Sequence, residues 1–500
     1  MFQTLKPFLC SASRLTASGR GLSVVFGLAL GLFPHLLFGW SDSDVEVRLK
    51  TPLTSYRTKP GVPFECVVLR PWISNGLVMI PEGSTVHGHV ARATTVGLGL
   101  RHERAKLDLV FDDFVTPDGH TFPLHATLDS IDNAREQVKS GVVRGVLAAG
   151  QPNELIFGMW SSPSVGMVSR TLVGLTGLSR QISSGLSLGP LADGGLLVLR
   201  LSLFRFPEPE IQYAPGADMN LKIVDPAVQQ GVQETPPVPL SAPDSVSDWL
   251  ANEPFSVDRR DNRPVGDIVN LAFLGSRQQL EQAFSAAGWA RAEPNTGKAK
   301  KQTYYAFNAM RAYATAPVSP LFYKGTLPEM VFEKSLNTIT KRHHIRVWYA
   351  GVVDGQELWL GAATHDTGGT FRLSSFKFTH KIDPNVDKER DKVVTDLRFA
   401  GCAEPEMHVD RPAVASNGLD RNSFTDGSAT VLSLTDCEGN HVPPYVFPKP
   451  GNMVSRLARR MILEARNHLL RENPYYWSYE IVKHTHDHVV QSNNQNRLGN

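Results

Sequence analysis

The feature that constrains this chain most is an Asp-Gly dipeptide, Asp354-Gly355, between two apolar, aromatic runs. A dipeptide of this kind in that setting is the strongest short-range signal for a two-residue β-hairpin turn. If the turn is of type I′, Val353 pairs with Gln356, and counting outward places His344 opposite His365. The sequence therefore predicts an antiparallel hairpin that brings distant histidines together at one end.

Side-chain alternation divides this hairpin into two faces. One face is apolar and is expected to be core: Ile345, Val347, Tyr349, Leu358, Leu360 and Ala362. The other face carries imidazoles, a guanidinium and two indoles over small residues: His344, Arg346, Trp348, Trp359, Gly361, Ala363 and His365. Because a solvated face more often carries Lys, Glu and Thr, the second face is the better place to look for a site.

Length and charge bound the class of protein. Five hundred residues exceed one ordinary domain, and 41% hydrophobic with 20% charged residues suit globular modules. The net charge is +2, and no basic block is interleaved with aromatic residues, so nucleic acid is not an expected partner.

The N-terminus has the pattern of an export signal. Lys6, Arg14 and Arg20 precede an apolar run over 21–40, and acidic residues begin only at Asp42. This pattern predicts a signal peptide or transmembrane anchor over residues 1–43, with the rest exported. No small-x-small cleavage site stands near the end of the run, which favours an uncleaved anchor. A buried N-terminal helix is the remaining alternative.

Composition predicts a multidomain fold. Residues 44–205 contain short strand-like runs with Gly and Pro between them and read as a small β-barrel or sandwich. Residues 206–265 are rich in Pro, Asp, Gln and Ser and read as a linker that holds a few short ordered pieces. Residues 266–447 read as a mixed α/β (α+β) domain, and 448–500 as an amphipathic basic helix with a polar tail.

Capping signals mark two helices in the α/β region. Ser276 is a plausible N-cap and Gly288 a plausible C′ residue for a helix between them. Asp383 before Pro384 predicts an N-cap and an N1 proline for a helix that ends at Phe399. The basic helix after residue 453 is expected to pack on the same domain, with an anionic membrane surface as the alternative.

Two resemblances follow from particular stretches. The stretch IPEGSTVHGHV, followed by KLDLVFDDFVTPDGHTFPL, resembles the β-barrel of TrbI-like conjugation-channel proteins, over residues 45–205. The pieces DIVNLAFLGS, RHHIRVW, LWLGAATHD and THKIDPNVDKERDKVVTDLRFAG resemble the LssY C-terminal domain family, over residues 267–401. That resemblance implies a bacterial, envelope-associated protein and implies no defined reaction. The PAP2-type phosphatase that accompanies this domain elsewhere is not expected, because its Ser-Gly-His tripeptide and multi-span region are missing from the sequence.

The candidate site residues are the positions that match the family's polar motifs: His343, His344, Arg346, His365, Asp366, His380, Asp383, Arg390 and Asp391. Three readings stay open. His344, His365 and His380 can bind a divalent metal ion such as zinc and leave a position for water. Alternatively, Arg346, the imidazoles and a helix N-terminus hold an anionic group such as a lipid headgroup. In the third interpretation these side chains bind no ligand. They only cap the helix, form hydrogen bonds with backbone groups and form ion pairs with carboxylates.

Other histidines and the cysteines give weaker indications of metal binding and of a disulfide. His87 and His89 share a strand face but lack a third ligand, and the cluster His484, His486 and His488 reads as a polar tail with incidental metal affinity. A disulfide between Cys402 and Cys437 would leave Cys66 free, and reduced thiols are equally compatible with the sequence.

The expected function is a non-enzymatic role in envelope assembly, secretion or surface organisation. The bulk of the chain is expected on the exported, periplasmic side, with the N-terminal segment in the membrane and with envelope proteins and anionic lipid as candidate partners. The alternative is a hydrolase or a module that binds lipid headgroups at the hairpin histidines. If it is an enzyme, a metal-dependent hydrolase is expected.

Overall fold

The computed structural model describes most of the chain between residues 44 and 437. The described ranges are 44–99, 102–146, 208–226, 229–238, 240–258, 264–372, 377–411 and 424–437, with scattered positions between 446 and 466. The expected N-terminal segment 1–43 and the histidines after residue 483 lie outside them. In the part of the chain that is described, no helix has the length and apolar character needed to cross a membrane.

An antiparallel sheet of nine strands forms the first module. Its order is β10-β11-β7-β6-β3-β1-β13-β9, and β8 pairs with β7. Because β9 and β10 follow one another in the chain and also contact each other, the sheet curls back on itself into a near-barrel. The bounds are β1 Asp44–Leu49, β3 Pro63–Val68, β6 Thr85–Thr94, β7 Lys106–Val115, β8 Thr121–Pro123, β9 Ala126–Ile131, β10 Gln137–Lys139, β11 Val142–Arg144 and β13 Asp218–Ile223.

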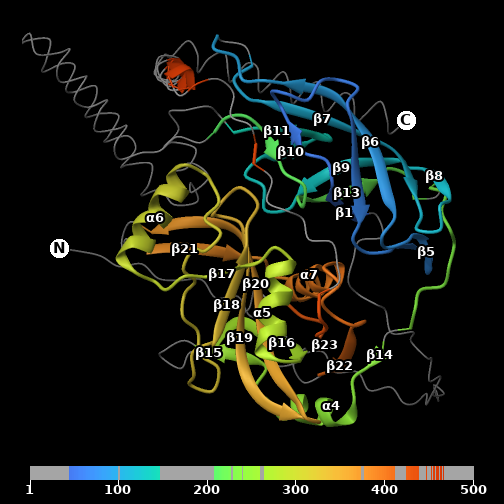
Figure 1. Cartoon of the computed structure of the whole chain (residues 1–500), viewed down its shortest axis with the longest axis vertical. Helices are drawn as coiled ribbons and strands as arrows, with labels where there is room; N and C mark the ends of the chain where they lie inside the picture. Colours follow the sequence, from blue (N-terminus) through green and yellow to red (C-terminus); the bar gives the residue numbers. More distant parts are fainter. Residues whose placement is uncertain are drawn as a thin grey trace, which may run out of the picture. The chain divides into compact units, whose positions relative to one another are not determined.

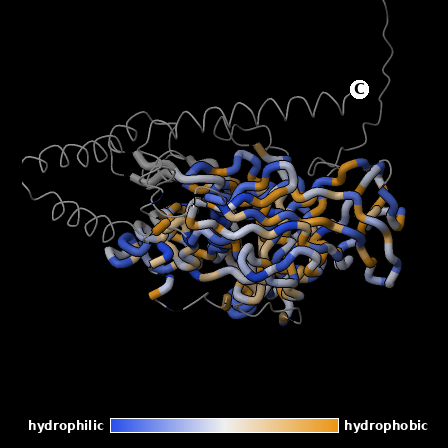
Figure 2. The backbone as a smooth tube through the Cα atoms, turned by 90° about the horizontal axis from the view of Figure 1, so that it is seen from above, coloured by the Kyte–Doolittle hydropathy of each residue, from blue (hydrophilic) through white to orange (hydrophobic). Residues whose placement is uncertain are grey.

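Alternating apolar residues explain why these strands curl around one core. In β7, Leu107, Leu109 and Phe111 are buried, and the residues between them are more exposed. The ring of Phe111 packs edge-on against Phe64 of β3 at 5.5 Å between centroids. Figure 2 shows hydrophobic and hydrophilic positions interleaved along the backbone tube. The β-rich module expected from the sequence is therefore confirmed.

The near-barrel extends beyond the range expected for it. β13 lies between β1 and β9 in the sheet, although its residues fall in the expected linker 206–265. Two short ribbons accompany the sheet: β2 (Leu53–Thr54) with β12 (Gln212–Tyr213), and β4 (Trp72–Ser74) with β5 (Leu77–Ile80). The Pro-rich composition of residues 206–265 hid β12 and β13, which are only two and six residues long.

A mixed sheet of ten strands forms the second module, with order β14-β22-β23-β16-β20-β19-β18-β17; β15 pairs with β16, and β21 with β20. The pairs β16–β23 and β14–β22 are parallel, and the others are antiparallel. The strand bounds are β14 Leu240–Ser241, β15 Ser256–Asp258, β16 Pro264–Leu274, β17 Ala290–Arg291, β18 Met330–Lys334, β19 Arg342–Val353, β20 Gln356–Arg372, β21 Lys377–Ile382, β22 Met407–Asp410 and β23 Ser428–Ser433. The helices are α4 Asp244–Ala251, α5 Arg277–Ala286, α6 Gly297–Asn308 and α7 Val386–Phe399.

Both faces of this second sheet are buried. α5 and α7 cover one face, where Phe284 and Leu397 join a core with Ile345, Val347 and Trp359 (Figure 1). α4 lies on the other face, where Val246 and Leu250 join a second core with Trp348, Leu358 and Leu360. The prediction of one core face and one polar face is therefore wrong at these central positions.

The two predicted helix starts have different outcomes. Ser276 caps α5 as expected, and its hydroxyl accepts from the backbone N–H of Gln279 within a complete capping box. For α7 the prediction is wrong by two residues, because Asn385 is the N-cap and accepts from the N–H of Asp387. Asp383 instead accepts from the backbone N–H of Asn385, so it shapes the turn before the helix.

The chain after residue 452 contributes to the first module. Leu463 is buried in the near-barrel core, and Arg459 pairs with Glu210 at 2.7 Å. Val454, at the start of this helix, is 76% exposed. The helix was expected to pack on the α/β domain, and the described contacts join it to the β-rich module instead.

Candidate functional site

The hairpin of β19 and β20 forms as predicted at its turn and differs further out. Asp354 and Gly355 have φ values of 52° and 81°, as a type I′ turn requires, and Val353 pairs with Gln356. A β-bulge then shifts the register between Tyr349 and Gly351. The extra residue places His343, and not His344, opposite His365, so the predicted pairing is wrong by one residue.

The one-residue shift sorts the candidate residues onto opposite sides of the sheet. His343 and His365 lie on the side covered by α5 and α7, together with Ile345 and Ala363. His344 and Arg346 lie on the other side with Asp366, beside the second core. The three histidines expected to share a metal ion, His344, His365 and His380, are thus divided between two clusters.

The first cluster joins the hairpin to the near-barrel, and both sheets belong to one compact unit, Gly39–Asn500. Its centre is His343, whose Nδ1 is 2.7 Å from Glu389 Oε2 of α7 and whose Nε2 is 2.7 Å from Asp132 Oδ2. Asp132 directly follows β9 of the near-barrel. We call the residues of this group the joint cluster: Asp132, Asn133, His343, His365 and Glu389.

The electrostatics of the joint cluster fix the charge on His343. Burial disfavours the charged ring, but Asp132 and Glu389 outweigh it and raise the pKa of His343 to about 10. Burial opposes the ionised form of Asp132 too, yet His343 holds the pKa of this carboxyl well below its usual range. His343 is therefore an imidazolium that donates to a carboxylate on each side.

His365 completes the joint cluster as a neutral ring. It stacks on His343 with 4.5 Å between centroids and an angle of 23° between planes. Burial and then the charge on His343 lower the pKa of His365. Its Nε2 is 2.8 Å from Asn133 Oδ1, next to Asp132 in the chain. The rings of His343 and His365 therefore contact adjacent residues, Asp132 and Asn133, of one turn in the near-barrel.

A network of buried charges extends the joint cluster along α7. Arg48 of β1 donates to Asp218 of β13 and to Asp396 of α7, each at 2.6 Å. Lys392 of α7 contacts both of these carboxylates, and Lys334 donates to Asp396 at 2.8 Å. All but Lys334 are buried, so α7 turns a charged side toward the near-barrel.

The second cluster surrounds Asp366 on the other side of the sheet. Asp366 Oδ2 is 3.1 Å from His380 Nδ1, 3.8 Å from His344 Nδ1 and 3.4 Å from Arg342 Nη2. Arg342 also donates to Glu333 at 2.7 Å. We call these five residues the Asp366 cluster.

Burial shifts the protonation of every acid and imidazole in the Asp366 cluster. It raises the pKa of Asp366 to about 6 and that of Glu333 to about 8, with Arg342 opposing both shifts. Burial and then Arg342 lower the pKa of His380 to about 4. Burial, followed by Arg346 and Arg342, lowers the pKa of His344 well below its usual range. Both imidazoles are neutral at physiological pH.

The remaining candidates serve separate contacts. Arg346 donates to Asp267 at 2.7 Å and to the backbone oxygen of Ser319. Arg390 donates to Asp426 at 2.9 Å and pairs with its neighbour Asp391 at the same distance. In these contacts neither arginine meets a histidine, so the single site expected from the sequence is divided into two clusters and the separate contacts of Arg346 and Arg390.

A metal ion fits the joint cluster poorly. Ligand atoms of Asp132, His343 and His365 lie within 4.8 Å of one another. An imidazole nitrogen binds a metal in the plane of its ring, and two rings stacked at 23° share no in-plane point within bonding distance. Both nitrogens of His343 already face carboxylates. We therefore assign a structural role, and not a metal-binding one, to the joint cluster.

Two further histidines suspected from the sequence form separate pairs. His87 lies 2.7 Å from Asp113 and His89 lies 2.8 Å from Asp112 across β6 and β7. All four side chains are exposed by about a third or more.

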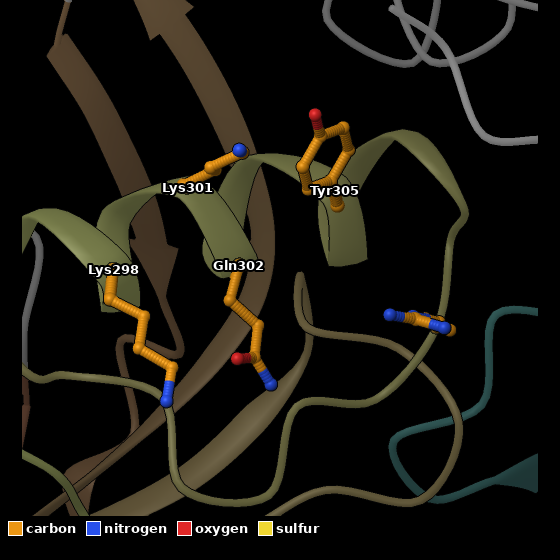
Figure 3. Close-up of a pocket in the computed structure, with 5 residues that line it drawn as sticks. Lys298, Lys301, Gln302 and Tyr305 are labelled. Atoms are coloured by element: carbon orange, nitrogen blue, oxygen red, sulfur yellow. The ribbon is translucent and has the colours of Figure 1, made fainter. Parts of the chain in front are cut away.

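Sequence reasoning missed a basic groove on α6. An open pocket of about 360 Å³ is lined by Lys298, Lys301, Gln302, Tyr305 and Arg311. Figure 3 shows the side chains that α6 contributes. The signal was present in the sequence as three lysines within GKAKK, in a stretch not assigned as a helix.

Comparisons with known proteins identify one part of the chain. Residues 256–429 match the model of the family described as the LssY C-terminus. The match confirms the resemblance carried by residues 267–401, and it covers the second sheet from β15 to the start of β23. No curated protein matches the chain.

Eighteen chains of solved structures match. One is ComB10 of the Com type IV secretion system of Helicobacter pylori, at 13% identity over 36% of this chain and 85% of that chain, with a TM-score of 0.19. A TM-score of this size supports no argument about fold or function.

Proposed function

We propose that this chain is a bacterial cell-envelope protein with a non-enzymatic role in envelope assembly, secretion or surface organisation. Its near-barrel and its LssY C-terminal module act as one unit. The observation that carries the proposal is the joint cluster, in which His343 bridges Asp132 of the near-barrel and Glu389 of α7.

The charge state of this bridge supports a structural role. A general base must present an unprotonated nitrogen to its substrate near neutral pH. His343 keeps its proton because two carboxylates raise its pKa to about 10, and the ring is 3% exposed. Breaking such a buried pair costs several kcal/mol, about 3–5, which suits a permanent joint between modules.

Two further observations support the exported location. Cys402 and Cys437 form a disulfide in the second module, and disulfides persist in oxidising compartments such as the periplasm. The positive-then-apolar pattern before residue 41 agrees with export. Cys66 is buried and unpaired, as the sequence allowed.

An activity screen tests the non-enzymatic role. The purified full chain is incubated with phosphoester, ester and glycan substrates, in parallel with Asp366→Asn, His343→Gln and the surface variant His87→Ala. We expect no turnover above buffer in any sample. Turnover that is lost in Asp366→Asn or His343→Gln and kept in His87→Ala would replace the proposal with a hydrolase.

A location experiment tests the envelope assignment. Alkaline phosphatase is fused after residue 500 and cells are fractionated, while the thiols at residues 402 and 437 are labelled before and after reduction. We expect phosphatase activity, a membrane-fraction signal and labelling only after reduction. An inactive fusion with free thiols would contradict the exported location.

A second candidate function, binding of an anionic headgroup, is favoured by the groove on α6. Lys298, Lys301 and Arg311 place three cations around one open pocket, and Gln302 adds an amide. Tyr305 contributes an aromatic wall, with the Lys301 ammonium 5.9 Å from its ring centre. Cations around a solvent-open hollow attract phosphate groups, with the attraction falling as salt increases.

Vesicle binding tests this second candidate. The full chain with Lys298→Ala, Lys301→Ala and Arg311→Ala is compared with a charge-matched triple variant at exposed near-barrel lysines, Lys50→Ala, Lys139→Ala and Lys222→Ala. We expect only the first triple variant to lose binding to phosphatidylglycerol vesicles, with no protein binding phosphatidylcholine vesicles. Equal loss in both variants would show general charge attraction and contradict the groove.

A further inference from the structure

The groove on α6 takes its lining from one face of the helix and from the loop that follows it. Lys298, Lys301 and Tyr305 are spaced by three and four residues, so they share one face of α6. Gln302 lies on the same face, and Arg311 comes from the loop after the helix. Figure 3 shows Lys298 and Gln302 extending in the same direction, while Lys301 extends toward Tyr305. Charge, an amide and an aromatic ring therefore line one hollow.

The cations of the groove are not neutralised by the protein itself. Among the described residues, Lys298, Lys301 and Arg311 form no ion pair with a carboxylate. Glu293 lies close enough to Lys298 for their charges to interact, but its carboxylate accepts from the hydroxyl of Thr315 at 2.9 Å. Because like charges three residues apart on a helix repel each other, a bound anion relieves a cost that the free protein carries.

The kinds of cation in the groove suit a phosphate group. The guanidinium of Arg311 is a planar fork that matches two phosphate oxygens, and each lysine adds a compact charge with three donors. A phosphomonoester carries roughly two negative charges near neutral pH, so three cations around one hollow are enough to neutralise it. The charged part of the ligand is therefore a phosphate.

Tyr305 and Gln302 indicate what the phosphate is attached to. The face of an aromatic ring is electron-rich and attracts weakly positive C–H groups, such as those on the face of a sugar ring. The amide of Gln302 offers both donors and an acceptor, and sugar hydroxyls can donate as well as accept. Inorganic phosphate or a glycerol phosphate would leave the half-buried Tyr305 ring uncovered. A sugar that carries a phosphate uses the whole lining.

The size of the pocket limits the ligand further. Its volume of about 360 Å³ lies near the lower end of the range for ligand pockets, roughly 300–1,000 Å³. A hollow of this size suits one sugar ring with its phosphate. Because the pocket is open, the rest of a larger molecule can stay outside it. The same chemistry is found in a free sugar phosphate and in the phosphosugar headgroup of a lipid.

We propose that the groove on α6 binds a phosphorylated sugar. Lys298, Lys301 and Arg311 hold the phosphate, and Tyr305 and Gln302 contact the sugar ring. The proposal rests on the second candidate function, binding of an anionic headgroup, and adds the feature that selects one headgroup over another. Since the cations supply attraction and the other two side chains supply selectivity, mutation can separate the two contributions.

Calorimetric titration of the full chain at low salt tests the selectivity. The probes are glucose 1-phosphate, glycerol 1-phosphate and glucose. We expect glucose 1-phosphate to bind about fivefold more tightly than glycerol 1-phosphate, and glucose not to bind. Tyr305→Leu should bind the two phosphates equally. Tyr349→Leu, at a tyrosine of β19 that is 45% exposed, should keep the preference of the parent protein.

Vesicles distinguish the two sources of the phosphorylated sugar. Phosphatidylcholine vesicles that contain lipid A, a phosphorylated sugar lipid, are incubated with the full chain, and glucose 1-phosphate is added as a competitor. Vesicle binding that the competitor displaces supports a lipid headgroup as the ligand. Calorimetric binding of glucose 1-phosphate without vesicle binding supports a free sugar phosphate.

The outcomes that contradict the proposal are separate from those that contradict headgroup binding. Circular dichroism shows whether each variant is folded, and Gln302→Leu, at an exposed position, is a second variant expected to lose the preference. Equal affinity of the parent protein for the two phosphates would overturn the proposal, and so would a preference that survives in both folded variants. Tighter binding of adenosine monophosphate than of glucose 1-phosphate would replace it with a nucleotide site. Phosphatidylglycerol binding through the groove would stand in each case, and it falls only if no phosphate compound binds.

Discussion

His343 illustrates how a single residue can look like a functional group and serve as a structural one. Adjacent histidines, an arginine and nearby acids in a short stretch suggest a site. In the folded chain, two carboxylates from different modules occupy both ring nitrogens. The side chain that would first be chosen for chemistry is thereby committed to a permanent ion pair.

Replacing His343 tests this role at the residue scale. We expect His343→Gln to lower the free energy of unfolding by about 3 kcal/mol, because Asp132 and Glu389 are left without their shared cation. Urea denaturation of the full chain measures the loss. His87→Ala removes an exposed pair and is expected to cost less than about 1 kcal/mol. Equal, small effects in the two variants would contradict the joint.

The raised pKa of His343 also predicts a pH dependence. The folded pKa is about 10 and the ordinary value is 6.5, so folding favours the protonated ring. The stabilisation is complete below about pH 6.5 and is lost as the pH rises through about 10. The difference in urea midpoint between the parent protein and His343→Gln should therefore shrink between pH 6.5 and 10. A difference that grows with pH would have the wrong sign.

At the scale of elements, helix ends and one bulge decide where the polar groups lie. The bulge between Tyr349 and Gly351 adds one residue to β19 and moves the side chains before it, from Arg342 to Tyr349, to the face opposite the one that counting from the turn gives. α7 begins at Val386, and its buried charged residues follow from that start: Asp387, Glu389, Arg390, Lys392 and Asp396. A shift of one residue in β19 would dismantle both clusters, and a shift of one residue in α7 would remove Glu389 from the joint cluster.

The cap of α5 gives a prediction at this scale. Ser276→Ala should lower the free energy of unfolding by about 1 kcal/mol, because the N–H of Gln279 loses its acceptor. Ser285→Ala, at an exposed position inside the same helix, should be neutral or slightly stabilising. Thermal unfolding by circular dichroism measures both variants. A larger loss at Ser285 would contradict the assignment of the cap.

At the scale of the whole molecule, buried charges and one covalent bond hold distant parts of the chain together. Arg48 reaches Asp396 across 348 positions of sequence. The disulfide between Cys402 and Cys437 ties the loop after α7 to the loop after β23. The described residues thus behave as one unit, in which damage to the joint should affect both modules.

Reduction of the disulfide tests this cohesion. Opening a loop of 35 residues should lower the free energy of unfolding by about 4 kcal/mol, on the chain-entropy account. Urea denaturation with and without a phosphine reductant measures the change, and Cys402→Ala with Cys437→Ala should reproduce it. The double variant should then be insensitive to the reductant. Full stability of both reduced and double-variant protein would contradict the contribution of the bond.

The sequence by itself determined the features that depend on neighbouring residues. The turn at Asp354-Gly355, the cap at Ser276, the strands of the first module and the similarity of residues 256–429 to the LssY C-terminus all follow from sequence patterns. Local rules suffice there because a turn or cap forms its hydrogen bonds within a few residues.

Only the tertiary structure decided which polar groups meet. Register counting from the turn failed at the bulge beside Gly351, a glycine inside the strand with a φ of 132° that the counting did not take into account. Asp132 joined His343 from 211 positions away. Burial then set the charges, since the same imidazole is protonated between carboxylates at His343 and neutral beside arginines at His344. These outcomes depend on the residues against which each side chain packs. The spacing of residues along the sequence does not determine those neighbours.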